Sequence, residues 1–199
     1  MGVRRVERFT AAFDWVIECL DTGHYLEAVA VLESLIGDRL GSRFSYLRKE
    51  QPRESVTVGG LCAALLNRFS KNSNPVTEDD PQFRAVIEDI LVWSKARNTA
   101  IHATAKIFGN NDPAVSFADG LAVHRETAVQ GVRLLQRFDV LDTRARAAHD
   151  QVPGHLPECV LPRQRAALDT AITGRSRADR DRGYRLSLRR RRARDSLPT

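Results

Sequence analysis

Cysteine, methionine and tryptophan are scarce in this chain, and long apolar runs are absent. The 199 residues include three cysteines, one methionine and two tryptophans. The cysteines, at 19, 62 and 159, are odd in number and widely spaced, so neither a disulfide framework nor a zinc site is indicated. The longest uncharged run, 55–67, is too short to cross a bilayer. We therefore expect a cytoplasmic protein with no membrane segment, no metal and no other cofactor.

The net positive charge of the chain is confined to its last quarter. Residues 1–150 hold 19 Lys and Arg against 20 Asp and Glu, whereas residues 151–199 hold 12 Arg against 5 acidic residues. The net charges, −1 and +7, add to the +6 of the whole chain. A basic protein often binds the phosphates of nucleic acid, but here only the tail has an excess of basic residues. We expect a folded domain over 1–150 and a disordered, Arg-rich tail over 151–199.

Apolar residues recur at three- and four-residue steps along most of residues 1–150, a spacing typical of amphipathic helices. Strand-like alternation is not found. We expect Thr77 or Asp79 to cap the helix predicted at about 83–107. The sequence therefore predicts an all-α fold, an antiparallel four- to five-helix bundle. Turn-forming residues separate five predicted helices, at about 5–20, 26–47, 61–69, 83–107 and 113–149.

One stretch of the fourth predicted helix combines residue types that could act chemically on a phosphate group. It places Arg97, Asn98 and His102 in an otherwise apolar or small-residue setting. A histidine, with an ordinary pKa of ~6.5, can act as general base or general acid. A guanidinium can hold a phosphate through its planar fork.

The spacing of this arginine and histidine is weak evidence by itself. With 27 arginines and five histidines, about 0.7 pairs at a given separation are expected by chance. Arg144 and His149 form a second such pair. Arg97 differs from Arg144 because a hydrogen-bonding Asn98 follows it inside a strongly periodic helix. The surrounding residues, rather than the spacing, favour the first pair.

Arg97, Asn98 and His102 resemble the signature of the HEPN family, which is an Arg, a polar residue, and a His four to six positions after the Arg. The segment 32–47 is also similar to the early helix of these bundles, and the resemblance covers residues 6–138. It implies a homodimer that brings two Arg/His sets together in one composite cleft, with RNA as substrate. Because RNA carries its own 2′-hydroxyl nucleophile, the implied reaction is cleavage to a 2′,3′-cyclic phosphate without a metal ion. It further implies a toxin of a toxin–antitoxin or phage-defence system, with an antitoxin protein as possible partner.

Each candidate residue has an expected role within that resemblance. Arg97, Asn98 and His102 would be catalytic. The RNA-binding residues would be Lys95 in the same helix and two arginines of the second predicted helix, Arg39 and Arg43. Some members of the family carry an aromatic hydroxyl residue two positions after the His, where this chain has Thr104. Regulation by modification of a tyrosine is therefore not implied.

Other interpretations stay open. The chain could be a non-catalytic helical dimer that binds RNA, a nucleotide or a partner protein. A DNA-binding regulator would depend on the Arg-rich tail alone. The charged residues of the second helix line the cleft or form exposed ion pairs. We expect His124, Trp15 and Trp93 to be core residues.

Overall fold

The computed structural model describes residues 3–68, 76–105 and 117–148, with side chains from 7–68, 76–101 and 123–148. These residues form five helices and no strand, which confirms the predicted all-α bundle. The predicted disorder of 151–199 concerns residues outside the described ranges. Each predicted helix overlaps one observed helix: α1 (Val3–Thr22), α2 (Tyr25–Arg48), α3 (Val58–Leu65), α4 (Pro81–Ala105) and α5 (Phe117–Ala147).

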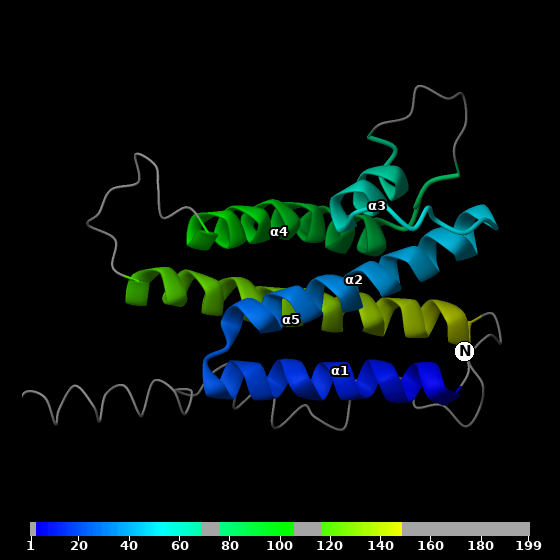
Figure 1. Cartoon of the computed structure of the whole chain (residues 1–199). Coiled ribbons are helices and arrows are strands. Elements are labelled where there is room, and N and C mark those ends of the chain that lie inside the picture. Colours follow the sequence, from blue (N-terminus) through cyan, green and yellow to red (C-terminus); the bar gives the residue numbers. More distant parts are fainter. Residues whose placement is uncertain (1–2, 69–75, 106–116, 149–199) are drawn as a thin grey trace, which may run out of the picture.

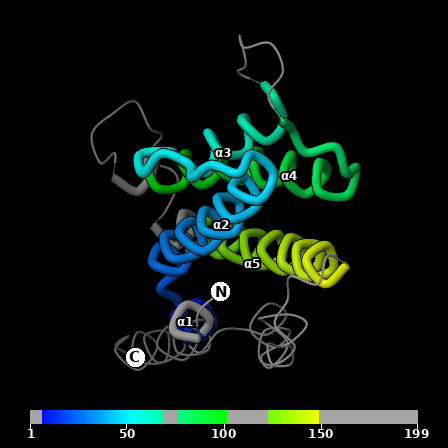
Figure 2. Tube along the Cα trace, turned by 90° about the vertical axis from the view of Figure 1, so that its right-hand side faces the viewer, coloured from blue at the N-terminus to red at the C-terminus, as the bar shows by residue number. Residues whose placement is uncertain are grey.

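The helices lie in three levels. Two perpendicular views show α1 as one outer level, α2 and α5 between, and α3 with α4 as the other outer level (Figures 1 and 2). α1 runs antiparallel to α2, and α4 runs antiparallel to α5 (Figure 1). α2 contacts α1, α3 and α5, while α5 also packs along α4. α2 is therefore the central helix, and both outer levels rest on it.

The start of α4 is set by Asp80. Its Oδ1 accepts hydrogen bonds from the backbone N–H groups two and three residues later, at 2.7 and 3.2 Å. Pro81 is the first residue of the helix. A backbone N–H at this position has no acceptor within the helix, so proline loses no hydrogen bond there. The prediction that Thr77 or Asp79 caps this helix is therefore wrong. The Asp-Pro step was the sequence signal that marked the boundary.

α2 passes its two internal glycines without a break. Gly37 and Gly41 lie inside a helix that is continuous from Tyr25 to Arg48. A Cβ on Gly37 would come within 3.5 Å of a Val58 methyl carbon, and one on Gly41 within 3.5 Å of the Pro52 ring. The small residues thus let α3 and the loop before it lie close to the α2 backbone.

Trp93 makes a close contact between α4 and α5. Its side chain is fully buried, and its indole N–H donates to the Thr127 carbonyl oxygen at 2.8 Å. An added Cβ on Gly131 would lie 2.8 Å from the ring. The core prediction holds for Trp93 and is wrong for Trp15, which is 47% exposed and donates its indole N–H to Glu27.

Gly131→Ala is expected to lower the free energy of unfolding by about 1–3 kcal/mol, because an overpacked core forces side chains and backbone to shift. Gly37→Ala is the matched control. Its Cβ would meet an ordinary contact, and alanine favours a helix over glycine by roughly 0.5–1 kcal/mol. Urea denaturation followed by circular dichroism measures both. Equal changes in the two variants would contradict the close contact at Gly131.

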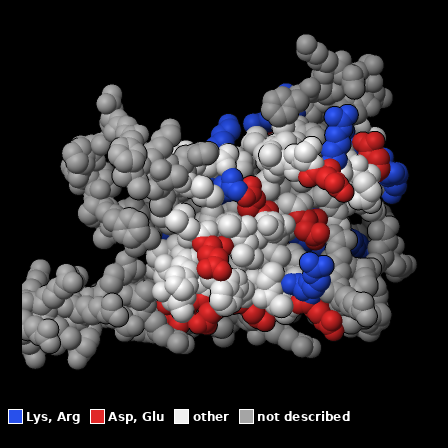
Figure 3. Space-filling model, viewed as in Figure 1, with Lys and Arg blue, Asp and Glu red and all other residues white. Residues whose placement is uncertain are grey.

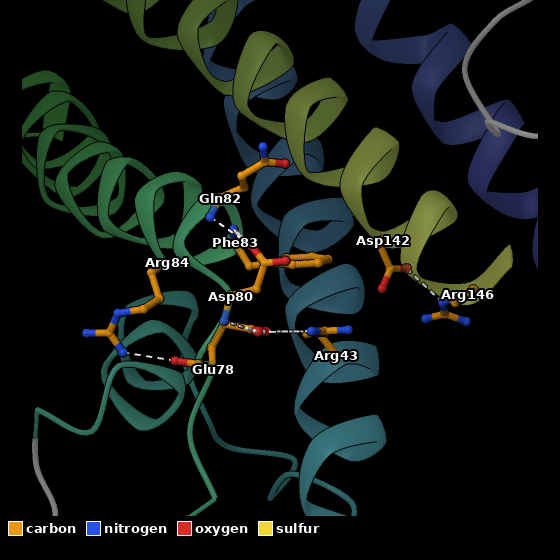
Figure 4. Close-up of polar contacts among 8 residues, drawn as sticks. All are labelled: Arg43, Glu78, Asp80, Gln82, Phe83, Arg84, Asp142 and Arg146. Carbon is orange, nitrogen blue, oxygen red and sulfur yellow. Dashed lines mark hydrogen bonds and ion pairs between the residues drawn. The ribbon is translucent and has the colours of Figure 1, made fainter. Parts of the chain in front are cut away.

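A buried ion pair holds the segment between α3 and α4 against α2. Glu78, which is fully buried, accepts hydrogen bonds from Arg43 Nε at 2.6 Å and Nη2 at 2.9 Å (Figure 4). Arg84 donates to the Glu78 carbonyl oxygen at 2.9 Å. The Arg43 guanidinium also lies 4.0 Å from the centroid of the Phe83 ring. Burial acts to lower the pKa of Arg43, but the hydrogen bond and charge of Glu78 outweigh it and raise that pKa.

A second buried arginine joins α2 to α5. Arg39 is 3% exposed and forms ion pairs with Asp139 at 2.5 Å and Asp142 at 3.0 Å. Asp142 also pairs with Arg146 at 2.8 Å (Figure 4). Arg146 in turn donates to the Ser42 hydroxyl at 2.9 Å. Carboxylates one turn apart on α5 thus neutralise one charge of α2.

Glu78→Ala is expected to lower the free energy of unfolding by about 3–5 kcal/mol, because it leaves the Arg43 charge buried without its counter-ion. Glu88→Ala is the control. It removes the carboxylate of an ion pair with Arg68 in which both side chains are about half exposed, and such pairs contribute about 0–1 kcal/mol. Chemical denaturation compares the two variants. Similar decreases in the free energy of unfolding would contradict a larger contribution from the buried pair.

Charges of both signs are interspersed on the face of the domain shown in Figure 3, where Asp and Glu patches alternate with Lys and Arg. The described residues on this face therefore form no continuous basic surface for nucleic acid. None of the helices in the described ranges combines the length and apolar character needed to span a bilayer.

Candidate functional site

Arg97 is held between α4 and α2. Its Nη2 forms an ion pair with Oε2 of Glu33 on α2, and its Nη1 donates a hydrogen bond to Oδ1 of Asn98. The structure thus brings together two of the three predicted catalytic residues. The structure adds the Glu33 carboxylate of α2 to this pair. From the sequence, Glu33 was only one of several charged residues on that helix.

The Arg97–Glu33 pair is partly withdrawn from water. The two side chains are 20% and 29% exposed. Burial lowers the pKa of Arg97, although a guanidinium stays charged at neutral pH. Its Nε is buried and has no hydrogen-bond partner among the described residues. Because water screens charge less in such a setting, an anion beside this guanidinium binds more strongly than on an open surface.

His102 lies on the same helix, since α4 continues without a break to Ala105. Five residues separate it from Arg97, which is about 140° around the helix axis and ~7.5 Å along it. Asn98 is one turn before His102 and shares its face. The His102 side chain lies outside the described side chains, so its role stays a prediction.

The predicted RNA-binding residues lie in two different settings. Lys95 is exposed on α4, two positions before Arg97. Arg39 and Arg43 are 3% and 7% exposed, and both form ion pairs inside the fold. Their burial assigns them to packing rather than to a binding surface. The expectation that charges of the second helix form exposed ion pairs is therefore wrong for these two arginines.

The second Arg–His pair of the sequence has no comparable setting. Arg144 is exposed near the end of α5, and His149 lies outside the described residues. Arg97, in contrast, contacts a neighbouring helix through a carboxylate. The surroundings that distinguished the two pairs in the sequence correspond to a real difference in packing.

An open groove adjoins Glu33. It has a volume of about 350 Å³ and lies between α2, the loop that follows it and the start of α3. This is near the lower end of the roughly 300–1,000 Å³ typical of small-molecule sites. Glu33 belongs both to this groove and to the ion pair with Arg97. The residues that line the groove are Glu33, Ser34, Gly37, Gly41, Pro52, Arg53, Glu54, Val56, Thr57, Val58 and Leu61.

Sequence reasoning missed this groove. Its walls come from α2 and from a loop with no recognisable motif, and they meet only after folding. The local signal that could have indicated it is the pair of glycines one turn apart in α2, Gly37 and Gly41.

Two cysteines and one histidine among the described residues are buried. Cys19 and Cys62 are free cysteines whose pKa values burial raises to about 11 and about 12, so neither is set up as a nucleophile. His124 is 4% exposed, as expected for a core histidine, and burial lowers its pKa. The described residues contain no group of three His, Cys, Asp or Glu side chains that could hold a metal ion.

Stability is expected to fall in mild acid because of His124. Burial lowers its folded-state pKa below the ordinary ~6.5, so the unfolded chain binds the proton more readily. The free energy of unfolding should therefore decrease as the pH falls below ~6.5 toward the folded-state pKa, and this contribution should be constant above ~6.5. Urea denaturation at about pH 7.5 and about pH 5.5 measures the decrease.

His124→Gln should reduce that decrease, since the variant lacks the titrating ring. His24→Gln is the control, because His24 is an exposed residue at the start of α2. It should retain the full dependence on pH. An unchanged slope in the His124 variant would refute the assignment.

The chain matches no protein-family model, and comparisons with curated proteins and with solved structures give no match. These results do not bear on the HEPN resemblance, which stays a prediction. The residues around Arg97 and their geometry are therefore the grounds for a functional conclusion.

Proposed function

We propose that this chain is a HEPN-like endoribonuclease that cleaves RNA without a metal ion and leaves 2′,3′-cyclic phosphate ends. The observation that carries the proposal is the setting of Arg97. Its guanidinium is partly buried, contacts Glu33 and Asn98, and lies on the same continuous helix as His102. A cation held in this way suits a phosphate better than a freely moving one, because it loses less side-chain freedom on binding.

The reaction uses the nucleophile of the substrate. A base removes the proton of a ribose 2′-hydroxyl, the 2′-oxygen bonds to the adjacent phosphorus, and the 5′-oxygen leaves and takes up a proton. His102 acts as that base or as the acid that protonates the leaving oxygen. Arg97 stabilises the negative charge that develops on the phosphorus oxygens. Asn98, as the acceptor of an Arg97 hydrogen bond, directs the guanidinium.

A homodimer would complete the site. The positions of Arg97 and His102 are about 140° apart around the axis of α4, so one helix does not readily present both residues to one phosphate. A two-fold dimer could place Arg97 of one copy beside His102 of the other. Val92 on α4 and Val123 on α5 are 63% and 58% exposed, which supplies apolar surface for such contact. The toxin role that the resemblance implies would pair this ribonuclease with an inhibitory antitoxin protein.

The alternative is a non-catalytic helical dimer that binds RNA, a nucleotide or a partner protein. The Arg97–Glu33 ion pair favours it, because an arginine whose charge is already neutralised can serve packing alone. The two functions differ in whether RNA is cut.

Purified full-length protein is expected to cut total RNA in EDTA and to leave 2′,3′-cyclic phosphate ends. Arg97→Ala and His102→Ala should each slow cleavage by about 100-fold or more, the lower end of what electrostatic stabilisation by Arg97 and general acid–base catalysis by His102 contribute. Arg97→Lys should also be impaired, because it keeps the charge but loses the planar fork. Gel analysis of end-labelled RNA gives the rates and the chemistry of the ends.

The controls are Arg144→Ala and His149→Ala, which remove the second Arg–His pair and should cut at the wild-type rate. Circular dichroism and size-exclusion chromatography establish whether each variant keeps its fold and its oligomeric state. RNA left intact by the wild-type dimer, or normal cleavage by both the Arg97→Ala and His102→Ala variants, would overturn the ribonuclease assignment. Binding of RNA without cleavage would support the alternative.

A further inference from the structure

We propose that the groove beside Glu33 binds a nucleobase of the RNA, and that Glu33 selects guanine there. The inference rests on the proposed function in one respect, since it assigns Arg97 to the phosphate of the bound nucleotide. The groove itself is a separate observation, with a volume of about 350 Å³.

Glu33 connects the groove to the cation. Its side chain lines the groove, and its Oε2 pairs with Nη2 of Arg97. The base and the phosphate of one nucleotide, or of two adjacent ones, are separated by a single ribose. A residue that borders both the groove and a phosphate-binding guanidinium therefore lies where it can contact the base next to the scissile bond.

The lining of the groove suits a flat ring. Gly37 and Gly41 leave the α2 backbone without side chains on that side, and Val56, Val58 and Leu61 supply apolar contact area. Val56 is 39% exposed, so part of its side chain is accessible to a ligand in the groove. A nucleobase combines apolar faces with a polar edge, and sites that recognise single-stranded RNA bind both.

The chemistry of a carboxylate favours guanine. An ionised Glu is an acceptor only, with about four lone-pair positions, so the contact of Oε2 with Arg97 leaves capacity for further donors. The Watson–Crick edge of guanine presents two adjacent donors, the N1–H and the 2-amino group, which match a carboxylate in a two-pronged contact. Adenine and cytosine place a ring acceptor beside their amino group, and uracil offers one donor between two carbonyl groups.

Calorimetric titration of the full-length protein with guanosine, inosine and adenosine 5′-monophosphates tests the base preference. The guanosine nucleotide should bind roughly tenfold or more tightly than the adenosine nucleotide, as expected for a two-pronged contact. The inosine nucleotide lacks the 2-amino group and should fall between them. Equal affinities for all three nucleotides, or no binding of any, would overturn the guanine site.

Glu33→Gln distinguishes base recognition by Glu33 from a purely structural role of this residue. The amide has one acceptor and one donor, which matches the edge of adenine rather than that of guanine. The ratio of guanosine to adenosine affinity should therefore fall by roughly tenfold. Glu27→Gln, an exposed substitution on the same helix, should keep the wild-type ratio. Gly37→Leu, which fills the groove, should weaken binding of every nucleotide while circular dichroism shows the helices intact.

Mapping the cut sites in an RNA of mixed sequence separates this inference from the proposed function. Wild type should cut next to guanosine, and Glu33→Gln should lose that bias. RNA cleavage with no base preference, or with the same preference in Glu33→Gln, would overturn the guanine site and leave the ribonuclease standing. Selective, Glu33-dependent binding of guanosine monophosphate without any RNA cleavage would support the groove and overturn the ribonuclease.

Discussion

Two arginines of α2 carry their charges into the interior, and the arrangement of the domain follows from the need to neutralise them. An unpaired buried charge costs several kcal/mol, so each guanidinium requires carboxylates at close range. α5 supplies them to Arg39, and the segment before α4 supplies Glu78 to Arg43. These contacts fix the rotation of α2, and Glu33 on the same helix then meets Arg97 of α4. The position of the candidate site thus depends on the buried ion pairs that orient α2.

The helices themselves were predictable, because the apolar spacing along the chain corresponds to buried faces in the bundle. Errors arose where a single local contact decides the outcome. The α4 boundary depends on Asp80 and the proline after it, and Trp15 is exposed although its spacing matches a core position. Periodicity assigns a residue to a face of a helix. It does not say how completely neighbouring helices cover that face.

Less of the site was predictable. Arg97 and Asn98 could be singled out because they lie in a periodic, largely apolar segment, and the structure brings them together. Arg39 and Arg43 have the same residue type and lie on an equally plausible helix, yet they are buried. The sequence does not indicate which arginine will meet a carboxylate from a neighbouring segment in the fold. The groove is assembled from α2, α3 and the loop between them, so no single segment contains its signal.

The contact of Arg39 with two aspartates on α5 has a consequence for how this chain can vary. Loss of the arginine alone would remove a counter-ion from two buried carboxylates, of which Asp142 keeps its ion pair with Arg146, and loss of either aspartate would remove part of the charge that neutralises the arginine. The three positions are therefore expected to change together in descendants of this sequence, through intermediates that are less stable than either end point. An uncharged triad of similar volume would be a reachable and stable alternative, separated from the present one by a fitness valley rather than by any defect of the final fold.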